Sequence, residues 1–124
     1  MLIHSIYIAC ILSVISSAAL SAPRCARDKT GFSEGFTRQA KASMEKGATC
    51  KWSYQLGGSF KYLKPSQKPA HGTIATPNAY TFTYTPSAGF SGTDTFMMDA
   101  GWEWQGGLRT GKLEVTVSVV DKLP

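Results

Sequence analysis

Strict alternation of apolar and polar residues, in short stretches separated by Gly and Pro, runs through this chain from residue 40 to residue 119. Successive side chains of a β-strand point to opposite faces, so each stretch predicts a strand with one buried and one solvated face. The stretches are 40–44, 50–56, 59–63, 80–85 and 112–119. No segment longer than a turn or two shows helical spacing. We therefore expect an all-β protein of about seven short strands, packed as a sandwich of two antiparallel sheets.

The alternation also predicts which side chains form the core. A turn at Gly57 and Gly58 joins the second and third stretches, and Pro65 and Pro69 are expected to end the third. The inward-facing set consists of Ala40, Ala42, Met44, Cys50, Trp52, Tyr54, Leu56, Phe60, Tyr62, Tyr80, Phe82, Tyr84, Leu113, Val115, Val117 and Val119.

The first residues have the layout of a signal peptide. An apolar run over 1–15 is followed by small residues at 16–22, although no Lys or Arg precedes the run. We expect residues 1–21 to be removed, so that Ala22 begins the mature chain and 22–124 forms a single domain. Retention of the run as an anchor is the alternative. Because Cys25 does not directly follow the cleavage site, no lipid anchor is expected, and the protein is predicted to be periplasmic or secreted without a stable membrane anchor.

The charge balance bears on the kind of partner. Thirteen Lys and Arg against eight Asp and Glu give a formal net charge of +5. The basic residues lie singly along the chain and form no stripe, so we expect no nucleic-acid partner.

Cysteine usage predicts one disulfide. Cys10 leaves with the signal peptide, so the mature chain has only Cys25 and Cys50. Export to an oxidising compartment favours a bond between them, with free or intermolecular thiols as the alternative. Two Cys without a Cys and His cluster do not make a metal site.

Two blocks of sequence carry a resemblance. Residues 68–74 read Lys-Pro-Ala-His-Gly-Thr-Ile, and 82–96 contain Tyr-Thr-Pro-Ser-Ala-Gly-Phe-Ser-Gly-Thr-Asp-Thr-Phe, followed by the alternating valines of the last stretch. In this the chain resembles the bacterial immunoglobulin-like and cadherin-like modules of envelope and surface proteins. The resemblance covers about half of the mature chain and implies an immunoglobulin-like (Ig-like) sandwich, here in a single copy.

Within this motif the residues have structural purposes. Gly89 and Gly92 allow turn conformations that other residues avoid, Phe90 and Phe96 are expected to fill the core, and Asp94 is expected to accept backbone N–H bonds. The full motif comprises His71, Gly72, Pro86, Gly89, Phe90, Gly92, Asp94 and Phe96.

Catalytic chemistry has few candidates. His71 is the only histidine after the signal peptide, and its place inside the turn motif favours a structural role. Asp94, Asp99 and Glu103 are the near neighbours that could form an acid and base pair or a calcium site, and solvated or turn-capping roles are favoured for them. We therefore expect no enzyme, no metal and no cofactor, with calcium as the alternative.

The segment 99–111 is the candidate binding site. If it is a hairpin loop, Trp102 and Trp104 fall on one side beside Arg109 and form an exposed aromatic platform for a sugar ring or a protein partner. In the alternative, both Trp side chains extend the core or cover an open sheet edge.

These observations favour an exported, non-enzymatic Ig-like module for binding, adhesion or structural support in the cell envelope, with a protein or a cell-surface glycan as its partner. One alternative is a carbohydrate-binding module that uses Trp102 and Trp104, with Tyr80 as a further candidate. The other is a secreted enzyme inhibitor, or an enzyme, that presents the same segment.

Overall fold

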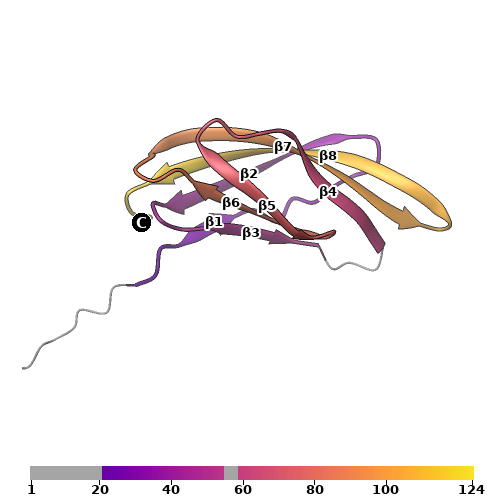
Figure 1. Ribbon diagram of the computed structural model, residues 1–124, viewed down its shortest axis with the longest axis horizontal. Helices are drawn as coiled ribbons and strands as arrows, with labels where there is room; N and C mark the ends of the chain where they lie inside the picture. The colour runs from indigo at the N-terminus through magenta and orange to yellow at the C-terminus, as the bar shows by residue number, and fades with distance from the viewer. Residues whose placement is uncertain (1–20, 55–58) are drawn as a thin grey trace, which may run out of the picture.

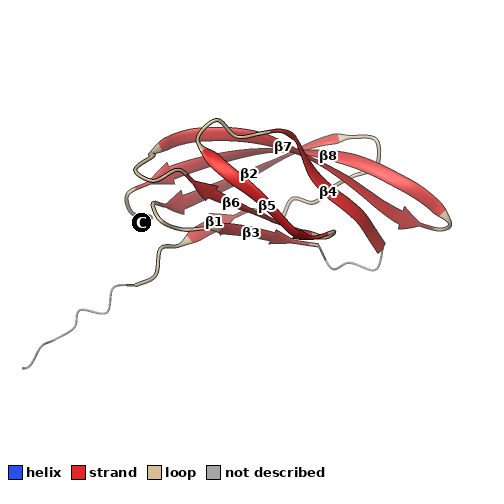
Figure 2. Ribbon diagram, in the orientation of Figure 1, coloured by secondary structure: helices blue, strands red, loops and turns tan. Residues whose placement is uncertain are grey.

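The computed structural model describes residues 21–54 and 59–124 and contains eight strands and no helix in those ranges (Figures 1 and 2). No helix long and apolar enough to span a membrane is present in this part of the chain. The predicted signal peptide, Cys10, Leu56 and the Gly57–Gly58 turn lie outside the described residues. The strands are β1 (Cys25–Arg27), β2 (Thr37–Glu45), β3 (Cys50–Ser53), β4 (Ser59–Gln67), β5 (Gly72–Asn78), β6 (Thr81–Pro86), β7 (Gly92–Trp104) and β8 (Gly107–Val120).

The strands form two sheets that face each other, which confirms the all-β sandwich. The larger sheet has the order β1-β2-β8-β7-β4 and the smaller one the order β3-β6-β5. All pairs are antiparallel except β2 and β8, which run parallel. These two strands come from opposite ends of the chain, so no tight turn forces them to be antiparallel.

The core lies between the sheets and follows the alternation. In β8 every second residue is buried, from Leu113 through Val119. Aromatic rings fill the centre: Trp52 stacks on Phe82 at 4.8 Å between ring centroids, and Tyr84 stacks on Phe96 at 5.5 Å. Tyr80 departs from the prediction, because it precedes β6 and is 37% exposed.

Two sequence predictions for β4 are wrong, the inward orientation of Tyr62 and the end of the strand at Pro65. Phe60 lies opposite Trp102, whereas Tyr62 lies opposite Gly101, with a register shift between them. Adjacent residues of β7 face opposite sides, so this β-bulge sends Phe60 inward and Tyr62 to the outer face. Pro65 does not end the strand but lies within it, beside a second shift. A proline is tolerated there because β4 is an edge strand.

The segment 99–111 is not a loop. β7 continues to Trp104 and β8 begins at Gly107, so the turn consists of Gln105 and Gly106 alone. Both residues have positive φ, 50° and 76° respectively, as a two-residue type I′ turn requires. The result is a long hairpin whose tip lies at the opposite end of the molecule from the C-terminus (Figure 1).

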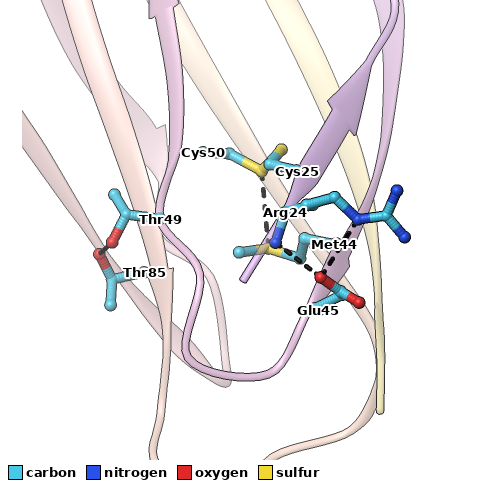
Figure 3. The surroundings of a disulfide bond; sticks show 7 residues. All are labelled: Arg24, Cys25, Met44, Glu45, Thr49, Cys50 and Thr85. Carbon is cyan, nitrogen blue, oxygen red and sulfur yellow. Dashed lines mark hydrogen bonds and ion pairs between the residues drawn. A yellow bond between two sulfur atoms is a disulfide. The ribbon is translucent and has the colours of Figure 1, made fainter. Parts of the chain in front are cut away.

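The predicted disulfide joins Cys25 of β1 to Cys50 of β3 with a Cα–Cα distance of 5.5 Å, and therefore connects the two sheets (Figure 3). The Sγ atom of Cys50 is buried 3.7 Å from the Sδ atom of Met44. Beside it, Glu45 accepts hydrogen bonds from the backbone N–H groups of Arg24 at 2.8 Å and Leu123 at 3.1 Å. Glu45 thus ties the N-terminal segment at Arg24 and the C-terminal segment at Leu123 to the end of β2.

Candidate functional site

The turn motif is organised around the buried carboxylate of Asp94 at the start of β7. It accepts hydrogen bonds from the backbone N–H groups of Ala70, His71 and Thr95, each at 3.0 Å, and from the hydroxyl of Tyr84 at 2.7 Å. Burial raises the pKa of the Tyr84 hydroxyl above its usual value of 10.0, and the hydrogen bond and charge of Asp94 raise it further. Tyr84 therefore remains a donor to Asp94 at neutral pH, and the carboxylate fastens the segment before β5 to β6 and β7.

The other residues of the motif shape the same turn. The His71 ring stacks on Phe90, with 4.4 Å between centroids and 8° between planes. Phe90 is only partly buried, whereas Phe96 is fully buried in the core. A Cβ atom on Gly72 would lie 2.3 Å from the Tyr84 ring, so no larger residue fits there without a shift. Pro86 is the last residue of β6, and Gly89 and Gly92 have positive φ, 78° and 133°. Each of these motif residues thus has either a packing contact or a special backbone position in the turn.

The hairpin separates the two tryptophans. Trp102 lies partly buried against the core, 6.0 Å from the Phe60 ring, and its Cη2 atom would be 3.2 Å from a Cβ placed on Gly111. Trp104 occupies the same side of β7 but is 51% exposed. The two rings therefore do not form one exposed platform, and only Trp104 is available to a partner.

Arg109 lies directly opposite Trp102 in β8. Its Nη1 atom donates to the carboxylate of Glu34 at 2.9 Å, and its Nε atom is buried with no hydrogen-bond partner among the described residues. The ion pair braces the hairpin against the segment that precedes β2. Arg109 is therefore already engaged with Glu34 and is only partly exposed.

Two exposed apolar side chains were missed from the sequence. Leu108, next to the turn, is 59% exposed, and Phe36, just before β2, is 70% exposed. Leu108 lies opposite Glu103, on the face that points away from the core. Extending the alternation of β8 back from Lys112 to Gly107 would have placed Leu108 on this outer face.

Comparison with known proteins settles the family. The bacterial Ig domain family matches residues 39–122 of the chain. This chain belongs to the bacterial Ig domain family. A search of the curated proteins finds no match.

Bacterial Ig domains are in general non-catalytic modules of surface and envelope proteins, and a disulfide is typical of an oxidising compartment outside the cytoplasm. In this Ig domain the acidic candidates do not converge. Asp99 pairs with Lys112 at 3.8 Å, Glu103 pairs with Lys61 at 3.5 Å, and Asp94 belongs to the turn. Residues 21–54 and 59–124 contain no group of three or more His, Cys, Asp or Glu side chains suited to a metal ion.

Proposed function

We propose that this Ig domain is an exported, non-catalytic binding module that acts in the periplasm or outside the cell and contacts a protein partner with the tip of the β7–β8 hairpin. The half-exposed indole of Trp104, held on two long paired strands, carries the proposal. Trp is among the residues that contribute most to binding when it is buried by a partner.

The geometry of the tip supports this role. Trp104 lies on the core-facing side of the hairpin and Leu108 on the outer side, so apolar surface is available on both faces of the tip. The pairing of β7 with β8 runs without a register shift from Gly92–Val119 to Trp104–Gly107, and the Arg109–Glu34 ion pair holds the hairpin from one side. A preorganised tip loses little conformational entropy on binding.

Site-specific photo-crosslinking in cells that export the full chain tests this proposal. A photoreactive phenylalanine derivative at position 108 should give a discrete adduct with an envelope protein, and Trp104→Ser should abolish that adduct. The matched control position is Ser43, which is exposed on β2 and lies opposite Ser118. Ser118 is eleven residues along β8 from Gly107 (118 − 107), roughly 35 Å from the tip. Equal adducts from positions 108 and 43, or none from position 108, would contradict the proposal.

Export and removal of the signal peptide are tested separately from binding. Mass spectrometry of the chain recovered from the periplasm or medium should give an N-terminus at Ala22. A recovered chain that still begins at Met1 would contradict processing and export as proposed here.

A further inference from the structure

A concave surface, separate from the hairpin tip, lies on the outer face of the five-stranded sheet. This outer-face groove has a volume of about 340 Å³, and its lining includes Phe36, Thr37, Tyr62, Asp99, Thr110 and Lys112. Phe36 precedes β2 and Tyr62 belongs to β4, with β8 and β7 between them. Three strand spacings separate the two aromatic residues, about 14 Å from backbone to backbone.

The bulge in β4 builds one wall of the groove. It turns Tyr62 outward onto Gly101, where a Cβ atom would lie 2.3 Å from the Tyr62 ring. The ammonium group of Lys64 sits 5.2 Å from the centroid of the same ring. Tyr62 is thus fixed in position, and the Phe36 ring on the other side is 70% exposed and available for contact.

The floor of the groove is polar and contains groups of both charges. The Oδ1 atom of Asp99 is buried and has no hydrogen-bond donor among the described residues. The Nζ atom of Lys112 lies 3.8 Å from it. The Asp99 side chain as a whole is 24% exposed, so the rest of its carboxylate can accept a hydrogen bond from a ligand hydroxyl group. The hydroxyl groups of Thr37 and Thr110 belong to exposed residues at the same site.

This combination selects a class of ligand. The Asp99 carboxylate lies at the floor, and both ammonium groups beside it are engaged, that of Lys112 with Asp99 and that of Lys64 over the Tyr62 ring. This disfavours a strongly anionic ligand, and the polar floor disfavours a continuous apolar segment. A pyranose ring has apolar C–H faces that pack on aromatic rings, and hydroxyl groups that both donate to a carboxylate and accept from an ammonium. We infer that the outer-face groove binds a neutral saccharide.

The saccharide site is independent of the proposed protein-binding tip. It is tested by titrating the isotopically labelled full chain with a panel of neutral oligosaccharides of glucose, galactose, mannose or N-acetylglucosamine at millimolar concentrations. At least one should shift the backbone amide signals of Thr37, Thr110 and Lys112. Phe36→Ala and Asp99→Ala should each weaken its binding by about tenfold or more.

The controls separate the groove from the tip. Trp104→Ala and Tyr80→Ala remove exposed aromatic rings outside the groove and should bind the same oligosaccharide as the unmodified chain does. Phe36 is mostly exposed, so Phe36→Ala leaves folding intact even if Asp99→Ala does not. The inference is overturned if no neutral oligosaccharide shifts these amides, if only a polyuronic acid or a peptide does, or if Phe36→Ala binds unchanged.

Discussion

At the scale of single residues, the buried carboxylate of Asp94 concentrates more hydrogen bonds than any other side chain of the turn motif. Its donors come from the segment before β5, from Tyr84 in β6 and from β7 itself. Hydrogen bonds to a charged group contribute more than neutral ones, and removing the acceptor leaves buried donors unpaired.

Asp94→Ala should therefore lower the free energy of unfolding by about 3 kcal/mol, measured by denaturant titration. Asp121→Ala is the matched control, because the Asp121 side chain is 84% exposed and its loss should change stability by no more than about 0.5 kcal/mol. In a double-mutant cycle with Tyr84→Phe, the two effects should not add. Additive effects would show that the 2.7 Å contact contributes nothing.

Glu45 provides a pH-dependent contribution at the same scale. Backbone hydrogen bonds from Leu123 and Arg24 lower the pKa of Glu45 below its usual value of 4.5, and the Arg24 charge lowers it further. A carboxyl group whose pKa is lower in the folded state stabilises that state above its unfolded pKa, and this stabilisation disappears as the pH falls through the folded pKa.

We therefore expect Glu45→Gln to be less stable than the unmodified chain at pH 7, with the difference closing between about pH 5 and pH 3. Denaturant titrations of both proteins across this pH range measure the difference directly. A difference that stays constant down to pH 3 would mean that titration of Glu45 is not its cause.

At the scale of elements, the turn of the β7–β8 hairpin contains one residue in an unfavourable conformation. Gln105 is the only non-glycine residue with positive φ in the described parts of the chain. Asn adopts this conformation at lower cost, and Asn-Gly is the preferred pair for a two-residue type I′ turn.

Gln105→Asn should thus raise the free energy of unfolding by about 0.5 kcal/mol, seen as a higher denaturant midpoint at unchanged slope. Gln105→Val is the opposing control, because a β-branched residue at positive φ should destabilise the hairpin by about 1 kcal/mol. If Val were tolerated as well as Asn, the turn would not be held in the type I′ geometry.

The elements also show how far sequence reasoning reached. Alternation located β2, β3, β6 and β8 because none of these strands holds the extra residue of a β-bulge; the shift between β5 and β6 adds its residue to β5. It misplaced Tyr62 because a bulge reverses the phase. It left 99–111 open between an exposed hairpin loop and a segment that extends the core, because the glycines of this segment also fit a flexible loop. Gly101 instead makes room for the Tyr62 ring, a tertiary contact that no pattern along a single strand reveals.

At the scale of the whole molecule, the outer-face groove also could not be predicted from patterns along single strands. Its walls come from before β2 and from β4, which are far apart in the sequence and are brought together by the strand order. The turn motif was recognisable because its residues are close in sequence and each occupies a special backbone or packing position. A surface assembled from four strands has no such local signature.

The Cys25–Cys50 disulfide is the only covalent link between the two sheets, apart from the backbone, in the described residues, and it bridges a sequence separation of 25. A closed loop of this length restricts the unfolded chain by about 3 kcal/mol. The double variant Cys25→Ala and Cys50→Ala should lose about this much stability in denaturant titrations, and the amide protons of β1 should exchange faster.

The hairpin tip lies at the far end of the sandwich, so binding through Trp104 should persist in the double variant under conditions in which it is folded. An unchanged denaturant midpoint would mean that the contacts of the core alone hold the sheets together. Loss of binding by a fully folded variant would instead show that the geometry of the tip depends on the distant disulfide.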